Sequence, residues 1–126
     1  MRATSVDHIV LTVRDVDATV AFYELLGLRR VMFGNGRVAL AFGEQKLNLH
    51  EHGREFEPKA VHPTPGSADM CFLLATPLDE ACAELDEAGI AVELGPVERD
   101  GAQGPIRSVY VRDPDGNLVE LAEPLP

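Results

Sequence analysis

The stretch Ser108-Val-Tyr-Val-Arg-Asp-Pro-Asp-Gly-Asn-Leu-Val-Glu-Leu121 decides the fold of this chain. Two short runs rich in β-forming residues flank the tetrapeptide Asp-Pro-Asp-Gly at 113–116, whose Pro and Gly positions are typical of a tight turn. The stretch therefore predicts a β-hairpin. In its second strand Glu120 shares a face with Leu118, and a carboxylate among apolar neighbours is costly to bury without a positive partner. Either water or a cation is therefore expected beside Glu120.

Length and composition predict one globular domain. The chain has 126 residues, 45% of them hydrophobic, so it can bury a sizeable core but is too short for two ordinary domains. Its net charge of -10 argues against nucleic acid and anionic membranes as partners, and is typical of a surface that promotes solubility. No signal peptide or membrane-spanning run is expected. Cys71 and Cys82 form no disulfide framework and no metal-binding motif, so a cytoplasmic protein is predicted.

The first half of the chain predicts the element order βαβββ. A helix is expected from about Asp17 to Leu26, with Asp15 or Asp17 as its N-cap and Gly27 as its end. One strand is expected before this helix, at residues 6–13, and three strands after it, at residues 29–33, 37–42 and 46–50. The turns Asn35-Gly36 and Gly43-Glu44 separate these three strands.

The second half repeats this order after a segment rich in Pro and charge. A helix is expected that Thr76-Pro77 caps and starts and that Gly89 ends. Residues 97–106, which contain two glycines, are expected to form a mobile loop, and its part from Arg99 to Ile106 is the best candidate for a lid. Strands are expected at 68–74, 91–94, 108–111 and 117–122. We therefore predict an α+β single domain over 1–126, with βαβββ modules at 5–54 and 67–123 in tandem and a linker at 55–66.

Four polar residues occupy paired positions in the two modules. His8 and Asp69 lie in the first strands, and His50 and Glu120 lie in the last strands. Imidazole and carboxylate groups bind divalent metals, and this set without thiolate suits Ni, Zn, Co, Mn or Fe without choosing among them. If the two half-sheets face each other, the four side chains converge on a metal site whose remaining positions are open to water or substrate.

Each of the four residues also has an ordinary structural explanation. His8 suits a hydrogen-bonded core histidine, and His50, which precedes Glu51 and His52, suits a solvated strand end. Asp69 suits a turn cap. Glu120 suits an edge strand, where a charge discourages aggregation. The agreement of strand parity and module position for all four favours the metal site.

Three segments of the chain resemble the vicinal oxygen chelate superfamily. They are Val-Asp-His-Ile-Val-Leu-Thr-Val at 6–13, Ala-Phe-Tyr with Leu-Gly-Leu within 21–28, and Asp-Pro-Asp-Gly-Asn-Leu-Val-Glu-Leu at 113–121. That superfamily contains glyoxalase I, fosfomycin-resistance transferases, bleomycin-resistance proteins, extradiol dioxygenases and methylmalonyl-CoA epimerase. The likeness covers nearly the whole chain and looks closest to the glyoxalase-domain-containing protein 5 group. It implies that the modules form a curved, cleft-containing mixed sheet with the helices outside.

The resemblance carries the family's metal-ligand positions onto the same four residues. The first-strand ligand falls on His8 and the final carboxylate on Glu120, whereas His50 and Asp69 depart from the Glu and His that glyoxalase I has there. Glu120 and Asp69 are the expected catalytic residues, because a carboxylate that holds the metal can also move a proton. Substrate contacts are expected from Asn48, Cys71, Ser108, Tyr110 and Arg107.

The leading functional interpretation is a metal-dependent lyase or isomerase of glyoxalase type that acts on a small oxygen-chelating substrate. Two alternatives stay open: an Fe(II)-dependent dioxygenase-like enzyme, and a metal-free protein that binds an antibiotic or metabolite as the bleomycin-resistance relatives do. Two-module chains of this family commonly dimerise, so a homodimer is expected. The sequence leaves open the substrate, the metal and whether glutathione takes part.

Overall fold

The computed structural model describes residues 1–126 and divides the chain into two compact units, residues 1–67 and 68–126. The first unit contains β1 (His8–Val13), α1 (Val16–Leu25), β2 (Arg29–Phe33), β3 (Arg37–Phe42) and β4 (Gln45–Glu51). The second unit contains β5 (Asp69–Leu73), α2 (Leu78–Glu87), β6 (Leu94–Gly101), β7 (Gly104–Arg112) and β8 (Leu118–Pro124). Neither helix has the length and apolar character that a membrane span requires.

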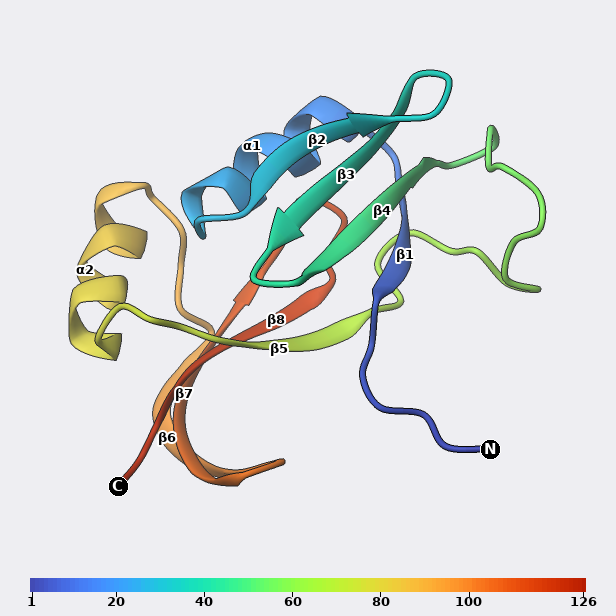
Figure 1. Ribbon diagram of the computed structural model, residues 1–126. Helices are drawn as coiled ribbons and strands as arrows, with labels where there is room; N and C mark the ends of the chain where they lie inside the picture. The colour runs from blue at the N-terminus through green and yellow to red at the C-terminus, as the bar shows by residue number, and fades with distance from the viewer. The chain divides into compact units, whose positions relative to one another are not determined.

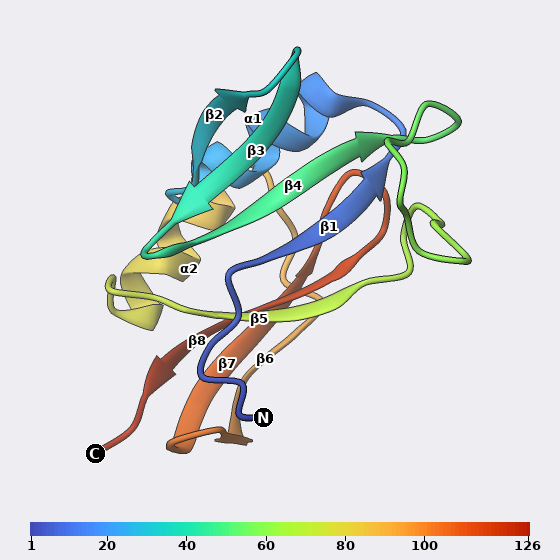
Figure 2. The ribbon, with the colours of Figure 1, turned by 45° about the vertical axis from the view of Figure 1, so that its right-hand side comes forward.

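Each unit forms a four-stranded mixed sheet, and the two sheets have the same topology (Figures 1 and 2). The strand order is β1-β4-β3-β2 in the first sheet and β5-β8-β7-β6 in the second. In each unit the first and last strands pair in parallel, and the other neighbouring strands are antiparallel. The prediction of an α+β fold with two βαβββ modules is therefore confirmed.

Buried apolar side chains of each sheet alternate with polar ones along the strands. In β1, β4, β7 and β8 most buried apolar residues are odd-numbered; they include Leu11, Val13, Leu47, Leu49, Val109, Val111, Val119 and Leu121. Buried Tyr23 of α1 and Leu78 and Leu85 of α2 complete the core of their own units. Since successive side chains of a strand point to opposite faces, the even-numbered residues lie on the other face. That face carries the predicted site residues of these four strands, apart from Arg107.

The two helices begin in different ways. Asp15 accepts a 2.9 Å hydrogen bond from the Ala18 N–H at the start of α1, as predicted for an N-cap. At the start of α2 no local side chain forms a cap, and Glu123 of β8 accepts a 2.8 Å bond from the Leu78 N–H. The prediction that Thr76-Pro77 caps this helix is therefore wrong, because a carboxylate distant in sequence satisfies the exposed N–H group.

Residues 94–112 form a β-hairpin and not a short strand followed by a mobile loop. β6 and β7 pair from Leu94–Tyr110 to Gly101–Gly104, so the strand predicted at 91–94 and the loop predicted at 97–106 are wrong. The two glycines indicate a loop in the sequence, but here they close the hairpin. A Cβ on Gly101 would lie 2.8 Å from the Gly104 carbonyl oxygen, so Gly101 allows the two strand ends to approach.

The predicted hairpin between β7 and β8 is held by a hydrogen-bond network around Asp113. The Asp113 carboxylate accepts bonds of 2.9, 2.9 and 2.7 Å from the N–H groups of Asp115 and Asn117 and from the Asn117 side chain. Asn117 Oδ1 in turn accepts a 2.8 Å bond from the Ala68 N–H, which ties the turn to the start of β5. Because Asp113 and Asn117 are buried, these bonds fix the register that places Glu120.

Candidate functional site

Glu120 lies at the centre of a polar group on the second sheet. The Ser108 hydroxyl donates a 2.6 Å hydrogen bond to Glu120 Oε2. In the strand ladders Glu120 is opposite Cys71 of β5 and opposite Tyr110 of β7. The structure therefore brings together four of the residues that the sequence singles out, namely Cys71, Ser108, Tyr110 and Glu120.

The Ser108–Glu120 bond is short because its acceptor is a carboxylate. Ser108 is fully buried and Glu120 is half-buried, so water competes little for this bond. The bond engages Oε2 and orients the carboxylate, and the Cys71 thiol forms a further hydrogen bond with Glu120. Such an arrangement suits a group that must be held in one position for chemistry.

Tyr110 extends the polar group towards β6. Arg99 Nε donates a 3.0 Å hydrogen bond to the Tyr110 hydroxyl, and the Arg99 guanidinium carbon lies 5.6 Å from the centre of the tyrosine ring. Arg99 also donates to the Glu98 carbonyl at 3.1 Å. The β6–β7 hairpin, which was predicted to be a loop, therefore places the Arg99 guanidinium at the site.

A cavity of about 600 Å³ opens beside Glu120 in the second unit. Its polar lining includes Cys71, Arg99 and Glu120, and its apolar lining includes Leu73, Ile106 and Leu125. The tip of the β6–β7 hairpin supplies a wall, where the sequence predicted a lid. The cavity has the size and the mixed lining of a small-molecule site.

Cys71 stays a neutral thiol in this environment. Burial raises the pKa of Cys71 to about 11, and the charge and hydrogen bond of Glu120 and the charge of Asp69 add to the effect. A thiol that holds its proton is a weak nucleophile and a weak metal ligand. Cys71 therefore suits a lining or hydrogen-bonding role beside Glu120.

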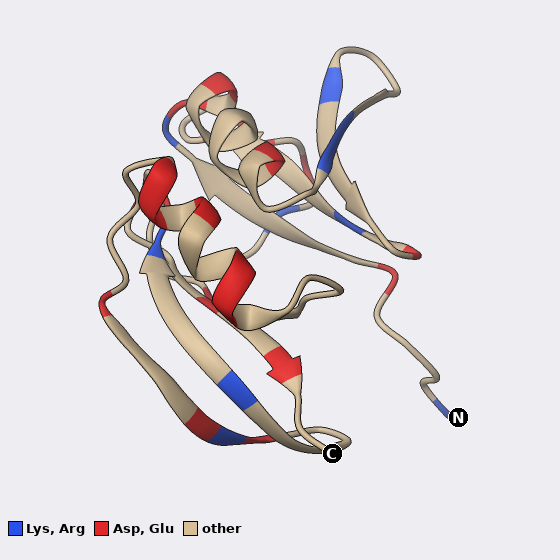
Figure 3. Cartoon of the chain, turned by 90° about the vertical axis from the view of Figure 1, so that its left-hand side faces the viewer, with Lys and Arg blue, Asp and Glu red and all other residues tan.

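Two further predicted residues of this unit lie apart from the Ser108–Glu120 pair. Asp69 is exposed and opposite Leu118, two residues before Cys71 on the same face of β5, which places it diagonally from Glu120 at a Cα separation of roughly 7–8 Å. Arg107 lies on the other face of β7, where its guanidinium contacts Asp79 at 3.2 Å and Glu123 at 3.4 Å. The acidic surface of α2 (Figure 3) thus supplies the partner of Arg107.

In the first unit, His8 is exposed at the start of β1. The Asp7 carboxylate lies 2.8 Å from His8 Nδ1. A carboxylate at Nδ1 favours the tautomer with its proton on that nitrogen, so the lone pair is on Nε2. This carboxylate–histidine pair is the arrangement that commonly orients a metal-binding histidine. Asp7 was not singled out in the sequence, although its position next to His8 is a usable signal.

The strand register separates His8 from His50. His8 is opposite Lys46 and His50 is opposite Thr12, so the two histidines lie four ladder positions apart, roughly 13 Å along the strands. Asn48 lies between them, opposite Val10. His8 pairs with Lys46, and Asn48 lies two residues after Lys46 in β4. In the same way Asp69 pairs with Leu118, and Glu120 lies two residues after Leu118 in β8. The position of the first sheet that corresponds to Glu120 is therefore Asn48 and not His50.

His50 is 3% exposed and has an unusual polar neighbour. Arg37 Nη2 lies 3.5 Å from His50 Nε2, and the Phe56 ring packs edge-on with ring centres 5.5 Å apart. Burial lowers the pKa of His50, the positive charge of Arg37 lowers it further, and Glu55 opposes this weakly. His50 is therefore neutral at pH 7. Arg37 and Phe56 were missed in the sequence, although the Gly43-Glu44 turn predicts a β-hairpin that places β3, and so Arg37, next to β4.

The imidazole nitrogens and carboxylate oxygens present are donor types that bind divalent metals. Neither unit by itself, however, brings together a complete set of metal ligands. Within either unit no three His, Cys, Asp or Glu side chains form a group that could hold a metal ion. The suitable single donors are the oriented His8 ring and the Glu120 carboxylate, with Asp69 diagonal to the latter.

Comparison with known proteins gives three informative matches. Residues 5–121 match the family model described as Glyoxalase/Bleomycin resistance protein/Dioxygenase superfamily. The chain is 55% identical over 119 residues to the virulence protein STM3117 of Salmonella typhimurium, covering 94% of this chain and 83% of that protein. The crystal structure of STM3117 matches with a TM-score of 0.97 over 99% of this chain and 100% of that chain.

Two more distant structures carry functional names. A lactoylglutathione lyase from Agrobacterium tumefaciens has a TM-score of 0.72 at 28% identity, covering 97% of this chain and 95% of that chain. TnmS3, an antibiotic binding protein from Streptomyces, has a TM-score of 0.77 at 26% identity, covering 99% of both chains. Resemblance to the glyoxalase-domain-containing protein 5 group in particular stays a prediction.

Proposed function

Because the chain belongs to the Glyoxalase/Bleomycin resistance protein/Dioxygenase superfamily, we propose that it is a divalent-metal-dependent lyase or isomerase of glyoxalase type. Its substrate in this proposal is a small molecule with two neighbouring oxygens. The observation that carries the proposal is Glu120, a carboxylate oriented by Ser108 at the wall of a 600 Å³ cavity. The structural likeness to a lactoylglutathione lyase supports the reaction class.

The metal ligands that we propose in the second unit are Asp69 and Glu120, and His8 is a separate candidate ligand of the first unit. The Asp7 carboxylate favours the His8 tautomer with its lone pair on Nε2, and the Ser108 hydroxyl orients the Glu120 carboxylate. His50, the fourth donor expected from the sequence, lies four ladder positions from His8 and is left out of this set. A bound divalent ion polarises substrate oxygens and stabilises negative charge that develops on them.

The remaining residues of the cavity have defined roles in this proposal. Glu120 moves a proton to and from the substrate, because a carboxylate within reach of the reacting carbon can act as general base and then as general acid. Arg99 and Tyr110 donate hydrogen bonds to a substrate oxygen, and Leu73, Ile106 and Leu125 exclude water from its apolar part. Cys71 remains protonated and packs beside the carboxylate.

A second candidate function is metal-free binding of an antibiotic or metabolite. The apolar part of the cavity lining and the likeness to the antibiotic binding protein TnmS3 favour it. In this case Glu120 and Arg99 recognise polar groups of the ligand and no proton moves. The two candidates differ in whether a metal ion is bound, which makes that the first property to measure.

The test is elemental analysis of tag-free protein after reconstitution with Ni, Zn, Co, Mn and Fe(II) in turn. We expect about one ion per chain in the wild type, as for a single specific site, and loss of that ion in Glu120→Gln. The matched control is Glu84→Gln, which removes an equal charge from an exposed position of α2 and should keep the metal.

Absence of stoichiometric metal in the wild type with every ion would overturn the enzyme proposal. Retention of metal in Glu120→Gln would remove Glu120 from the ligand set. A glyoxalase assay with a thiol-adduct substrate, with and without glutathione, then separates a lyase from an isomerase that needs no thiol.

A further inference from the structure

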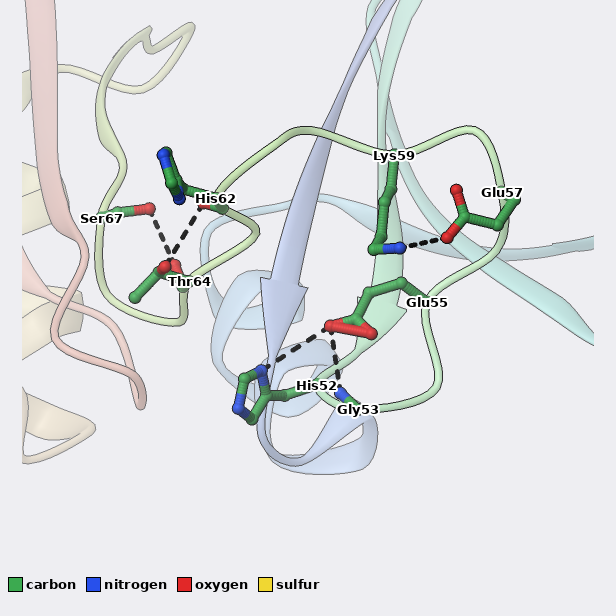
Figure 4. Close-up of polar contacts among 8 residues, drawn as sticks. All are labelled: His52, Gly53, Glu55, Glu57, Lys59, His62, Thr64 and Ser67. Carbon is green, nitrogen blue, oxygen red and sulfur yellow. Dashed lines mark hydrogen bonds and ion pairs between the residues drawn. The ribbon is translucent and has the colours of Figure 1, made fainter.

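Arg99 is the cation of the second unit that has no acidic partner. The unit contains three cationic side chains, Arg99, Arg107 and Arg112. Arg107 and Arg112 each lie within ion-pair distance of an Asp or Glu side chain. In the loop that precedes the unit, Lys59 also contacts a glutamate (Figure 4). The contacts of Arg99 are a hydroxyl and a carbonyl oxygen, so its charge stays available for a ligand.

The Arg99 guanidinium is held in place by the β6–β7 hairpin. Its Nε donates a 3.0 Å hydrogen bond to the Tyr110 hydroxyl, and its Nη1 donates a 3.1 Å bond to the Glu98 carbonyl. A guanidinium has N–H groups on all three nitrogens, so those of Nη2 remain without a protein acceptor. Because Arg99 is already positioned, less conformational entropy is lost when an anion binds to it.

The cavity of about 600 Å³ receives this positive charge, since both Arg99 and Glu120 belong to its lining. From the end of β6, Arg99 reaches back to Tyr110, which is opposite Glu120 in the β7–β8 ladder. Glu120 forms its hydrogen bonds with Ser108 and Cys71 and no ion pair with Arg99. A ligand in the cavity can therefore lie between the guanidinium and the carboxylate.

Asp100, a second acidic residue of the lining, does not neutralise Arg99. Arg99 is opposite Ile106 in the β6–β7 ladder and shares a face of the sheet with Tyr110. Since successive side chains of a strand point to opposite faces, the Asp100 side chain points to the face that carries Arg107. No ion pair joins Asp100 to Arg99, so the charge beside the cavity is positive at this end.

The lining between Glu120 and the hairpin tip is apolar. Leu73 and Ile106 lie opposite positions two and four residues further along β8 than Glu120. Leu125 completes this surface, and its N–H donates a 2.9 Å hydrogen bond to the Pro105 carbonyl at the tip. Leu73 is 63% exposed, which favours a ligand whose apolar part removes this side chain from water.

We propose that the substrate of this cavity is a carboxylate anion with an apolar body. The carboxylate accepts hydrogen bonds from Arg99, the apolar body covers Leu73, Ile106 and Leu125, and two neighbouring oxygens lie beside Glu120. This inference rests on the proposed function and deepens it, because it assigns a charge and a shape to the substrate. A small neutral dicarbonyl would leave Arg99 and most of the apolar lining unused.

The test is an NMR titration of metal-free, isotope-labelled protein with three probes that share one apolar body: phenylbutyrate, phenylbutanol and phenylbutylamine. Wild type should bind the anion about fivefold or more tightly than the neutral alcohol, with shifts at the amides of Gly101 and Gly104 in the cavity wall. Arg99→Met should reduce the affinity for phenylbutyrate to that for phenylbutanol and leave phenylbutanol binding unchanged. Arg112→Met is the matched control, since it removes an arginine of the same unit outside the cavity lining and should keep the preference.

Equal phenylbutyrate affinity in wild type and Arg99→Met would overturn the proposal, as would no binding of phenylbutyrate by wild type. Tighter binding of phenylbutylamine than of phenylbutyrate would overturn the anion assignment and show that the acidic side chains of the lining dominate. Metal content of Arg99→Met should match the wild type, and its loss would overturn the role of Arg99 as a substrate contact alone. Because the titration uses metal-free protein, failure of anion binding and failure of metal binding are separate results.

Discussion

The backbone of Gly95 lies directly against the carbonyl group of Ser108, since a Cβ on Gly95 would be 2.5 Å from the Ser108 oxygen. Gly95 has a φ of 112° and lies at the irregularity in the β6–β7 pairing between Leu94 and Val97. The residue that orients Glu120 is thus packed against a position that only glycine can occupy without a backbone shift.

Gly95→Ala should therefore destabilise the protein by more than its backbone conformation alone explains. We expect a loss of roughly 3 kcal/mol in the free energy of unfolding, from the positive φ together with the contact at Ser108. Gly104→Ala is the matched control, because Gly104 also has a positive φ of 130° but has free space around it. Its loss should be roughly 1 kcal/mol. Urea unfolding measures both, and equal losses would contradict a steric role for the Gly95–Ser108 contact.

Ser108→Ala should affect both stability and the proposed metal. It removes the Ser108 hydrogen bond to the half-buried Glu120 carboxylate, which should lower the free energy of unfolding by roughly 1–3 kcal/mol. Loss of an orienting bond typically weakens metal binding about tenfold or more. Ser67→Ala, which removes an exposed hydroxyl bonded to the Thr64 carbonyl, is the control and should change neither quantity. Unchanged metal affinity in Ser108→Ala would show that the Ser108 bond has only a structural role.

Cys71 should react slowly with alkylating reagents at neutral pH. Only the thiolate reacts, and burial raises the pKa of Cys71 from 9.0 to about 11. In a Cys82→Ser background the iodoacetamide rate should keep rising with pH up to about 11. Glu120→Gln removes the carboxylate charge, so it should lower the Cys71 pKa and speed alkylation at pH 8. A wild-type rate that levels off below pH 9 would contradict this assignment.

The same pKa of Cys71 predicts a loss of stability in alkaline solution. The unfolded thiol loses its proton near 9.0 and the folded thiol near 11, so the folded state binds more protons between these values. The contribution of Cys71 to stability is therefore present below pH 9 and lost as the pH rises towards 11. Cys71→Ala should remove this part of the pH dependence in urea unfolding.

His50 predicts the opposite behaviour in acid. Its pKa is lowered in the folded state, so below the ordinary value of 6.5 the unfolded state binds a proton that the folded state does not. Stability from neutral His50 is thus present above pH 6.5 and lost as the pH falls. His50→Gln should flatten the decline in urea midpoint between pH 7 and pH 5, whereas His62→Gln, at an exposed position, should leave it unchanged. A decline as steep in His50→Gln as in wild type would mean that other groups cause it.

Local patterns in the sequence were sufficient to predict the fold. β2 and β3 begin and end where the sequence predicted, and Gly27 and Gly89 end both helices with a positive φ. The Asp-Pro-Asp-Gly turn closes its hairpin as expected. These features depend on residues close in the chain, such as turn dihedrals, caps and the alternation of side chains. Ser108 and Tyr110, both expected from the sequence to contact substrate, lie beside Glu120.

The sequence was misleading where a strand is polar. β6 reads Leu-Gly-Pro-Val-Glu-Arg-Asp-Gly, a composition typical of a loop, and it is a strand because β7 pairs with it along its length. Pairing with β7 satisfies the backbone groups on that side of β6 whatever its side chains are. The tip of this hairpin lines the cavity in the region where the sequence predicted a mobile loop.

The amino-acid sequence by itself determined the two βαβββ modules, the turn at Asp113 and the face on which Glu120 lies, because each follows from contacts within a few residues. Only the tertiary structure decided the partners: Glu123 as the cap of α2, Asn48 as the ladder counterpart of Glu120, and Phe33 and Phe56 around Arg37. These depend on strand register and loop position. A shift of register by two residues preserves every hydrophobic pattern in the sequence but changes which polar groups meet.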